Sequence, residues 1–409
     1  MKRKYLYIII IFTVLLCCGI ILFLALRQNK HGSNDETYVY DTVDPGCNYS
    51  EHTVLYLDDS GILHLIDTTS GKDMIYCDKP NCTHEGYSRN NENPSCPAAF
   101  FTGDSGPVLY NGHLYLIGNM SDEDITTQYL YEMDSNGENR KKVATLEDVQ
   151  YIRYVLYRDR YVVGAYGNRV VINDEGQIIN DNKPEAGIFV IDLENDKVYM
   201  GDVITGEQAN ITGIYYEEGM VYYSCIHFDD DITELMIEDA VESNSESFAY
   251  DNMLYDIYQY DIANESTTLL KTFDHINNLQ LLDGDAYCES KEGYFVFDKK
   301  SGEIRELPID KDAGILSGRF ARHGDALYYA IFNDDNNEVT YYRMENGKGN
   351  EQMKMSPENA FSIVNICGQS VYVRYNNDKG RYCLGVLSLD DLNQGRFRVR
   401  ELRCYDEEE

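Results

Sequence analysis

Short apolar alternations that end in an acidic residue recur along the chain and divide it into similar units. Each has the length of a short strand, and its closing Asp or Glu can accept hydrogen bonds from the backbone N–H groups of a turn. The seven alternations are Leu63–Asp67, Leu130–Asp134, Phe189–Asp192, Ile257–Asp261, Tyr294–Asp298, Tyr341–Glu345 and Val386–Asp390.

A second strand, usually containing tyrosine, precedes each alternation and is entered through a turn with glycine. Asn-Gly readily adopts the positive φ values of a two-residue hairpin. These turns include Asn111-Gly112, Glu218-Gly219, Asp283-Gly284, His323-Gly324 and Cys367-Gly368.

Four short strands per unit predict an all-β fold, a β-propeller of seven four-stranded blades, with six or eight blades as alternatives. Adjacent tyrosines such as Tyr328-Tyr329 point to opposite faces of a strand, which suits a blade that is covered on both sides. The high tyrosine content, 36 residues, also favours strands. A row of β-sandwich domains is the weaker alternative, because no linker interrupts the units after Thr53.

The first unit shows only three strands, at Thr53–Leu57, Ile62–Ile66 and Asp73–Tyr76. Its innermost strand has to come from Thr37–Tyr40 or from elsewhere. The last unit contains all four strands and ends with Arg396–Leu402. Since a circular array needs its ends joined, strand exchange between the termini is a plausible closure.

An uncharged apolar run, Tyr5–Leu26, precedes the repeats and follows a basic tip at residues 1–4. At ~1.5 Å per residue it is long enough to cross a bilayer. The run predicts a transmembrane signal anchor at 5–26, with residues 1–4 in the cytoplasm and the rest outside the cell. A lipoprotein or a secreted form is the alternative. Residues 27–50 then form an extracellular tether, with a stray strand conceivable at Tyr38–Tyr40, and 51–409 form the propeller.

The formal net charge is −35, and every acidic residue follows position 30. Such a surface repels phosphate backbones, so nucleic acid is excluded as a partner. It either keeps the protein soluble or attracts cations or a basic partner.

Two insertions interrupt the repeat, at Asn168–Glu185 and at the acidic segment 229–252. In the second, Ile232–Val241 has apolar spacing compatible with a short helix. Loops on one face of a propeller commonly carry its binding function, although a tolerated surface insertion fits equally well.

The sharpest candidate site is the cluster Cys77, Cys82, His84 and Cys96 in the loop 77–98. Three thiols and an imidazole can hold a structural zinc ion. Outside a membrane disulfides compete, and Cys47 could complete two bridges. Free thiols are the third alternative. Either a zinc ion or disulfides would hold this polar loop in a fixed conformation.

Other cysteines lie within strands of the repeat. Cys383 and Cys404 fall on the third and outer strands of the last unit, where a hairpin centred near Leu392–Gln394 predicts a cross-strand disulfide. Cys225 and Cys288 lie in second strands and are predicted to be buried.

No catalytic residue can be assigned. Gly103–Pro107 mimics a protease nucleophile loop, but it reads better as a turn. No Gly-x-Ser-x-Gly elbow occurs in the sequence, so it carries no signature of a propeller-associated hydrolase.

The anchor, the tyrosine-rich units and a C-x-x-P-x-C-x-H…C-x-A segment together resemble a group of surface propellers of Gram-positive anaerobes. Elsewhere the units resemble TolB-like or low-density-lipoprotein-receptor-like propeller repeats. Many members of the group are lipoproteins, whereas this chain lacks a usable lipobox. The segment comprises Cys77, Pro80, Cys82, His84, Cys96 and Ala98.

The resemblance implies binding of a protein, peptide or glycan at the cell envelope and supplies no catalytic activity. A non-enzymatic binding or scaffold protein is therefore the leading hypothesis. A cell-wall lyase or hydrolase with acidic residues at the propeller mouth is the second. A component of a membrane sensor or assembly complex is the third.

Overall fold

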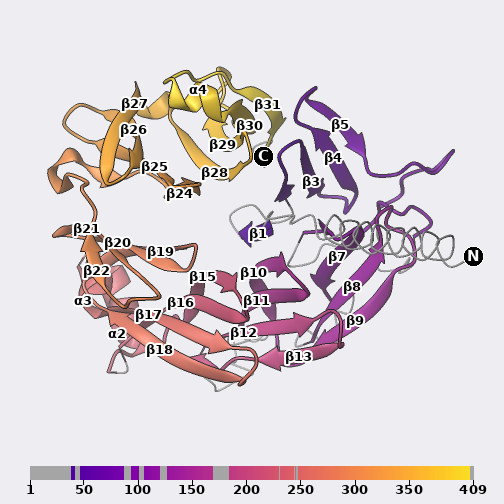
Figure 1. Ribbon diagram of the computed structural model, residues 1–409, viewed down its shortest axis with the longest axis horizontal. Coiled ribbons are helices and arrows are strands. Elements are labelled where there is room, and N and C mark those ends of the chain that lie inside the picture. Colours follow the sequence, from indigo (N-terminus) through magenta and orange to yellow (C-terminus); the bar gives the residue numbers. More distant parts are fainter. Residues whose placement is uncertain are drawn as a thin grey trace, which may run out of the picture. The chain divides into compact units, whose positions relative to one another are not determined.

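Seven antiparallel sheets follow one another along the chain and form the blades of a ring (Figure 1). The computed structural model describes residues 38–41, 47–86, 94–100, 106–119, 127–168, 184–229, 231–243, 245 and 247–405. The predicted anchor at 5–26 and the tip at 1–4 lie outside these residues. Within the described ranges, no helix has the length and apolarity needed to cross a membrane. The predicted seven-bladed all-β propeller is confirmed.

The strands of each blade are consecutive and are given innermost first, except that β1 (Tyr38–Asp41) is added inside the strands of blade 3. Blades 1 to 3 comprise β2 (Cys47–Tyr49), β3 (Thr53–Leu57), β4 (Leu63–Asp67) and β5 (Lys72–Ile75); β6 (Val108–Tyr110), β7 (His113–Gly118), β8 (Gln128–Asp134) and β9 (Lys141–Leu146); and β10 (Tyr151–Arg158), β11 (Tyr161–Asn168), β12 (Glu185–Asp192) and β13 (Lys197–Met200), with β14 (Ile204–Thr205) also on β12.

Blades 4 and 5 comprise β15 (Asn210–Glu217), β16 (Met220–Phe228), β17 (Met253–Asp261) and β18 (Ser266–Phe273); and β19 (Ile276–Leu282), β20 (Asp285–Ser290), β21 (Gly293–Phe297) and β22 (Ile304–Glu306). Blades 6 and 7 comprise β23 (Ile315–Leu316) and β24 (Ala321–His323), which both pair with β25 (Ala326–Asn333), then β26 (Glu338–Glu345) and β27 (Lys348–Met355); and β28 (Phe361–Cys367), β29 (Ser370–Asn376), β30 (Tyr382–Ser388) and β31 (Arg400–Cys404).

The turns between strands use the chemistry that the sequence predicts. At the hairpin of β6 and β7, Asn111 and Gly112 have φ values of 49° and 81°, as a two-residue turn requires. After β21, the carboxylate of Asp298 accepts hydrogen bonds from the backbone N–H groups of Lys300 and Ser301 (2.9 and 2.7 Å). These local interactions fix where each strand ends.

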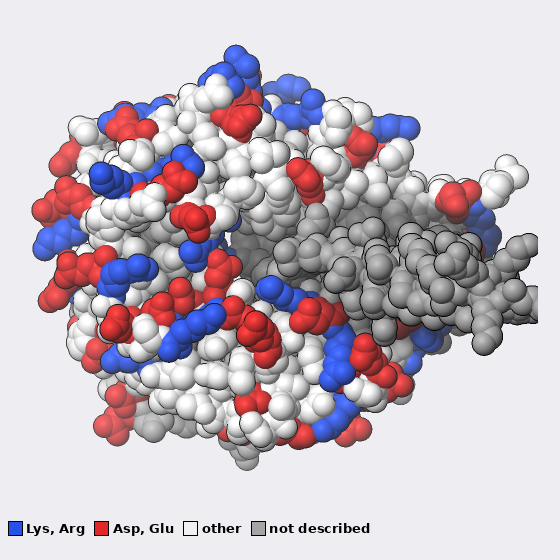
Figure 2. Space-filling view, in the orientation of Figure 1, with Lys and Arg blue, Asp and Glu red and all other residues white. Residues whose placement is uncertain are grey.

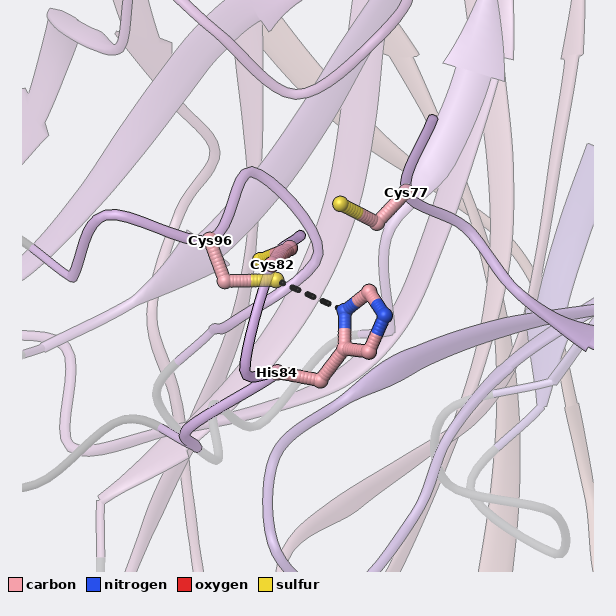
Figure 3. Close-up of side chains that lie close together, drawn as sticks. All are labelled: Cys77, Cys82, His84 and Cys96. Carbon is pink, nitrogen blue, oxygen red and sulfur yellow. Dashed lines mark hydrogen bonds between the residues drawn. The ribbon is translucent and has the colours of Figure 1, made fainter. Parts of the chain in front are cut away.

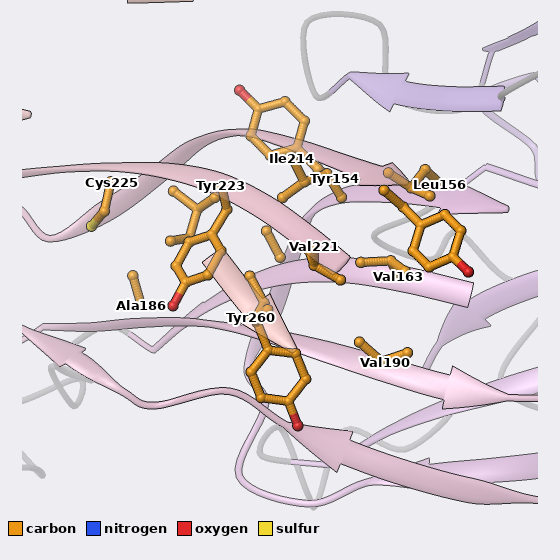
Figure 4. Close-up of a cluster of buried hydrophobic side chains, with 14 of the residues drawn as sticks. Tyr154, Leu156, Val163, Ala186, Val190, Ile214, Val221, Tyr223, Cys225 and Tyr260 are labelled. Atoms are coloured by element: carbon orange, nitrogen blue, oxygen red, sulfur yellow. The ribbon is translucent and has the colours of Figure 1, made fainter. Parts of the chain in front are cut away.

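Seven clusters of buried hydrophobic side chains hold the ring together, one between each pair of neighbouring blades. In blade 6, Tyr328 packs toward blade 7 and Tyr329 toward blade 5, as predicted for adjacent tyrosines. The cluster between blades 3 and 4 includes Tyr223 and Tyr260 (Figure 4). Tyr223 is fully buried and stacks on Tyr258 with a centroid separation of 5.2 Å. Every blade therefore buries both of its faces.

The ring closes by side-chain packing between blades 7 and 1. The rings of Tyr49 and Tyr372 lie 4.8 Å apart, and the Tyr372 hydroxyl donates to the Ser50 carbonyl (2.5 Å). Ser370 donates to the Glu51 carbonyl (2.7 Å). Since each of these two sheets contains only strands from its own unit among the described residues, the predicted strand exchange is wrong.

The segment predicted as a tether contributes strands to the propeller. The innermost strand of blade 1 is β2, so the propeller begins at Cys47 and not at residue 51. The predicted stray strand is present as β1 (Tyr38–Asp41), which pairs with the free edge of β10 and is therefore the innermost strand of the blade 3 sheet. The alternation in Cys-Asn-Tyr is too short to show as a strand in the sequence.

Two short helical segments occupy the insertion after β16, and a third interrupts blade 7. These are α2 (Glu234–Glu242) and α3 (Phe248–Asn252), as the spacing at Ile232–Val241 partly predicts, and α4 (Leu389–Asn393). The hairpin expected near Leu392–Gln394 is therefore a helix. Ser388 caps it by accepting a hydrogen bond from the Asp391 N–H (3.0 Å).

One face of the ring carries the connections between second and third strands and the starts of the innermost strands. We call it the loop face. The chain leaves β7 at Gly118, β11 at Asn168 and β16 at Phe228 on this face, and each time returns only after a long insertion. On the opposite face the strands are joined mainly by tight turns. The strands that flank the long insertions of blades 2, 3 and 4 therefore end and begin on one side of the propeller.

Candidate metal centre

The loop that carries the predicted ligands is fixed to blade 1 at both ends. It begins directly after β5, and it returns as a strand-like segment in which Ala99 bridges Ile62. The backbone N–H of Leu63 donates to the Ala98 carbonyl, and that of Phe100 to the Gly61 carbonyl (both 2.7 Å). The apolar segment Cys96–Phe100 is buried between blades 1 and 2. This burial explains how a polar loop is held in place.

The structure brings Cys77, Cys82, His84 and Cys96 together, as the spacing suggests (Figure 3). One ligand atom from each lies within 4.8 Å of all the others. Asn81 and His84 adopt positive φ values of 57° and 52°, a conformation in which Asn and His are enriched among residues with a side chain. These two backbone conformations allow the side chains of Cys82 and His84 to reach the same cluster.

The arrangement fits a tetrahedral zinc ion. Zn–S bonds of about 2.3 Å and Zn–N bonds of about 2.0–2.1 Å place neighbouring ligand atoms roughly 3.6–3.8 Å apart. The Cys96 Sγ lies 3.6 Å from the His84 Nδ1. Four protein ligands complete the coordination, so the ion would have a structural role and no open position for a substrate.

The thiols of the cluster differ in acidity. A hydrogen bond from the backbone N–H of His84 lowers the pKa of Cys82, which favours the thiolate that a metal binds. Burial raises the pKa of Cys96 to about 12. A bound cation would reverse that effect, because metal coordination deprotonates thiols.

Blade 2 supports the loop through Arg140. Its Nη2 donates to the Pro97 carbonyl (2.9 Å), and its guanidinium lies 4.5 Å from the centroid of the Phe100 ring. Gly137 has a φ of 82°, and a Cβ there would come within 2.3 Å of the Pro97 oxygen. Contacts with blades 1 and 2 therefore hold the loop that carries the cluster in place.

The disulfide alternative that included Cys47 does not match the fold. Cys47 lies on β2 in the core between blades 7 and 1, on the other side of blade 1 from the cluster. Cys77, Cys82 and Cys96 form no disulfide in the structure. Elsewhere, Cys383 and Cys404 are directly opposite in the ladder of β30 and β31 and form a disulfide. Cys225 and Cys288 are fully buried, as predicted.

Sequence reasoning missed two polar groups that the fold buries. Asp256 accepts hydrogen bonds from Thr272 (2.6 Å) and Tyr258 (2.8 Å) and lies 3.1 Å from the His227 Nε2. Arg374 is 8% exposed in the middle of blade 7. The burial of Arg374 could have been suspected from the sequence, because it is a charged residue inside the apolar alternation of Ser370–Asn376.

These observations define a seven-bladed β-propeller with a closed Cys3His cluster at the junction of blades 1 and 2. No family model matches the sequence, and no curated protein matches it. Similar solved structures include the Pyrococcus horikoshii acylaminoacyl peptidase (12% identity, TM-score 0.51, 91% of this chain). They also include a puromycin-hydrolyzing peptidase of Mycobacterium tuberculosis (12%, 0.53, 89%) and the Porphyromonas gingivalis dipeptidyl peptidase 4 (8%, 0.50, 90%).

The chain spans 54%, 55% and 60% of the lengths of these three proteins, respectively. At such low identity the likeness shows the propeller fold alone.

Proposed function

We propose that this chain is a non-enzymatic binding protein of the cell envelope. Residues 5–26 anchor it in the cell membrane, and the propeller lies outside the cell and recognises a protein through its loop face. The long insertions of three blades start and end at strands on that face, which supports a recognition role, because such loops carry binding in many folds. The Cys3His cluster, with a zinc ion, supplies rigidity and no chemistry.

The observation that carries this proposal is the exposed helix α2. It has no buried residue, and Leu235, Met236 and Val241 are 71%, 42% and 73% exposed. A surface helix ordinarily buries its apolar residues, so a helix that leaves three of them in solvent marks an interaction site.

The base of this insertion is ordered by its own contacts. The rings of Phe228 and Phe248 lie 5.8 Å apart, and the Asp229 N–H donates to the Asn252 carbonyl (3.1 Å). Ile232, just before α2, is buried. These contacts hold the base of α2 in a defined position, which lowers the entropy cost of binding a partner.

The charge of the insertion indicates the kind of protein partner. Figure 2 shows lysines and arginines interspersed among acidic residues on the face in view, but Asp229–Asn252 contains no Lys or Arg. Glu234, Glu238, Asp239 and Glu242 lie on α2 itself. A partner with an apolar groove and basic flanks would complement the helix in both respects.

The catalytic alternative, a cell-wall glycosidase, needs two carboxyl groups about 5–10 Å apart around its substrate. A cavity of about 430 Å³ between blades 6 and 7 has no Asp or Glu in its lining and therefore does not provide such a pair. The membrane-complex alternative differs from the proposal only in the partner, and identifying that partner would decide between them.

Crosslinking in source cells tests the proposal. Full-length protein should be crosslinked in intact cells, purified in detergent and its partners quantified by mass spectrometry. A Leu235→Ser, Met236→Ser, Val241→Ser variant is compared with a control, Leu269→Ser with Ile304→Ser, which alters two exposed apolar residues on outer strands, 49% and 52% exposed. The same partner should be captured by wild type and control and lost from the α2 variant. Equal capture by all three forms would refute recognition through α2.

A further inference from the structure

His227 and Asp256 form a nearly buried pair at the base of the insertion that carries α2. Their side chains are 14% and 8% exposed, and the His227 Nε2 lies 3.1 Å from an oxygen of the Asp256 carboxylate. His227 is on β16 and Asp256 on β17, so the pair joins the two strands between which the insertion leaves and returns. Phe228, which follows His227, is paired with Met253, the first residue after the insertion.

Both nitrogens of the His227 ring face hydrogen-bond acceptors. The Nδ1 lies 2.9 Å from the carbonyl oxygen of Phe228, and the Nε2 faces the Asp256 carboxylate, which also accepts hydrogen bonds from Thr272 and Tyr258. Burial opposes ionisation of Asp256, but these hydrogen bonds, led by that from His227, hold its pKa below the ordinary value. A neutral imidazole has a single N–H and cannot donate to both oxygens. The geometry therefore requires the protonated ring.

Of the described side chains around this site, His227 is of the type that exchanges a proton near neutral pH. Burial raises the pKa of Cys225 to about 12, and burial and a hydrogen bond to a carboxylate raise the pKa of Tyr258. The remaining neighbours are acidic residues, Glu207 on the segment before β15 and Asp229 at the start of the insertion. Their negative charge also favours the protonated ring.

Loss of the ring proton would remove one of the two hydrogen bonds. A charged acceptor holds an N–H more strongly than a carbonyl does, so the remaining proton stays on the Nε2 beside Asp256. The Nδ1 then faces the Phe228 carbonyl without a proton, which leaves two acceptors unsatisfied. The Phe228 ring contacts Phe248, and the Asp229 N–H donates to the Asn252 carbonyl. Displacement of Phe228 would therefore loosen the base of the insertion.

We propose that the proton on His227 regulates α2. With the ring protonated, the base of the insertion is held in place and the helix is presented to a partner. As the pH rises through the titration of the ring, the base loosens and recognition through α2 weakens. The effect on recognition rests on the proposed function, whereas the loosening of the insertion does not.

A single fluorescent reporter tests the loosening, because the chain contains no tryptophan. Phe248→Trp places the reporter beside Phe228, and the full-length protein in detergent is titrated from about pH 5 to about pH 9, a range that includes the ordinary pKa of histidine. Its emission should shift to longer wavelength in one step as the pH rises. Adding His227→Gln should abolish the step. Adding Asp256→Asn should abolish it too, because an amide N–H can donate to the unprotonated Nε2 while the Nδ1–H keeps its carbonyl.

His275→Gln is the matched control. His275 also contacts the insertion, with its ring 5.6 Å from that of Tyr250 on α3, and its replacement should leave the step in place. Circular dichroism across the same range checks that each variant stays folded. No step in the parent protein, a step retained in both the His227 and Asp256 variants, or a step lost in the control would overturn the proposal.

The crosslinking experiment described above, repeated at about pH 6 and about pH 8.5, measures the consequence for recognition. Capture of the α2-dependent partner by wild type should fall about tenfold at the higher pH, because a charge-assisted hydrogen bond is lost, whereas His227→Gln should show no such fall. Equal capture by wild type at both pH values would overturn the regulatory role. If no partner depends on α2, the proposed function fails, and the fluorescence titration still decides whether His227 controls the insertion.

Discussion

The closure between blades 7 and 1 can be tested by truncating Tyr372. Its side chain is fully buried in the core shared by the two blades, against Tyr49. If the ring is closed by this packing, Tyr372→Ala should destabilise the whole propeller, because unfolding of either terminal blade exposes the same core. The variant thus measures how tightly the ring is held shut.

The expected loss follows from the contacts. Truncating a fully buried large aromatic side chain costs about 3–5 kcal/mol of unfolding free energy. Tyr372→Phe removes the hydroxyl that donates to the Ser50 carbonyl but keeps the ring, and it should cost about 0.5–1.5 kcal/mol. A double-mutant cycle with Tyr49→Ala should show a coupling of about 0.5–1.5 kcal/mol.

Urea unfolding of the full-length protein, followed by tyrosine fluorescence and circular dichroism, provides the measurement. Tyr223→Ala is the matched control, because Tyr223 is equally buried between blades 3 and 4, which the chain joins directly. The two truncations should cost similar amounts. A loss below about 1 kcal/mol for Tyr372→Ala, with the full loss for Tyr223→Ala, would show that the ring is open between its terminal blades.

Three further outcomes are expected. The purified protein should contain about one zinc ion per chain by elemental analysis; Cys96→Ser should abolish it, whereas Cys288→Ala should retain it. Replacing both Cys383 and Cys404 by Ala should cost about 3 kcal/mol in urea unfolding, since the disulfide spans a sequence separation of 21, and an unchanged midpoint would contradict this. Burial opposes ionisation of Asp256, but hydrogen bonds, led by that from His227, hold its pKa below the ordinary value. Its carboxylate therefore contributes stability above about pH 4 that disappears at lower pH, so the cost of Asp256→Asn should be largest at neutral pH and should shrink on acidification.

Much of the fold is visible in the sequence because it depends on local chemistry. The third strands are marked by alternation and by the acidic residue that opens the following turn, and the structure has strands at all seven predicted places. The helix α4 was missed for a local reason too. Ser388 and Asp391 form an N-terminal capping pattern that predicts a helix, but the segment was interpreted as the turn of a hairpin.

The parts that could not be predicted depend on distant residues. Nothing in the sequence links Tyr49 to Tyr372, and the short strand at Cys47–Tyr49 gives too few residues for a periodic signal. The four candidate ligands of the Cys3His cluster could be named because they are close in sequence. The cavity between blades 6 and 7 could not be predicted, because it requires side chains from two blades.

The pairing of β1 with β10 determines how mechanical force would enter the propeller. Tyr38–Asp41 pair with Tyr154–Tyr157 of blade 3, and only afterwards does the chain begin blade 1. Tension applied to the chain ahead of residue 38 would therefore act first on the hydrogen bonds between β1 and β10. It would reach the junction of blades 7 and 1 only after these hydrogen bonds had broken. The pairing of β1 with β10 would therefore protect the junction of blades 7 and 1, where no strand pairing among the described residues joins the two sheets, from force applied to the N-terminal segment.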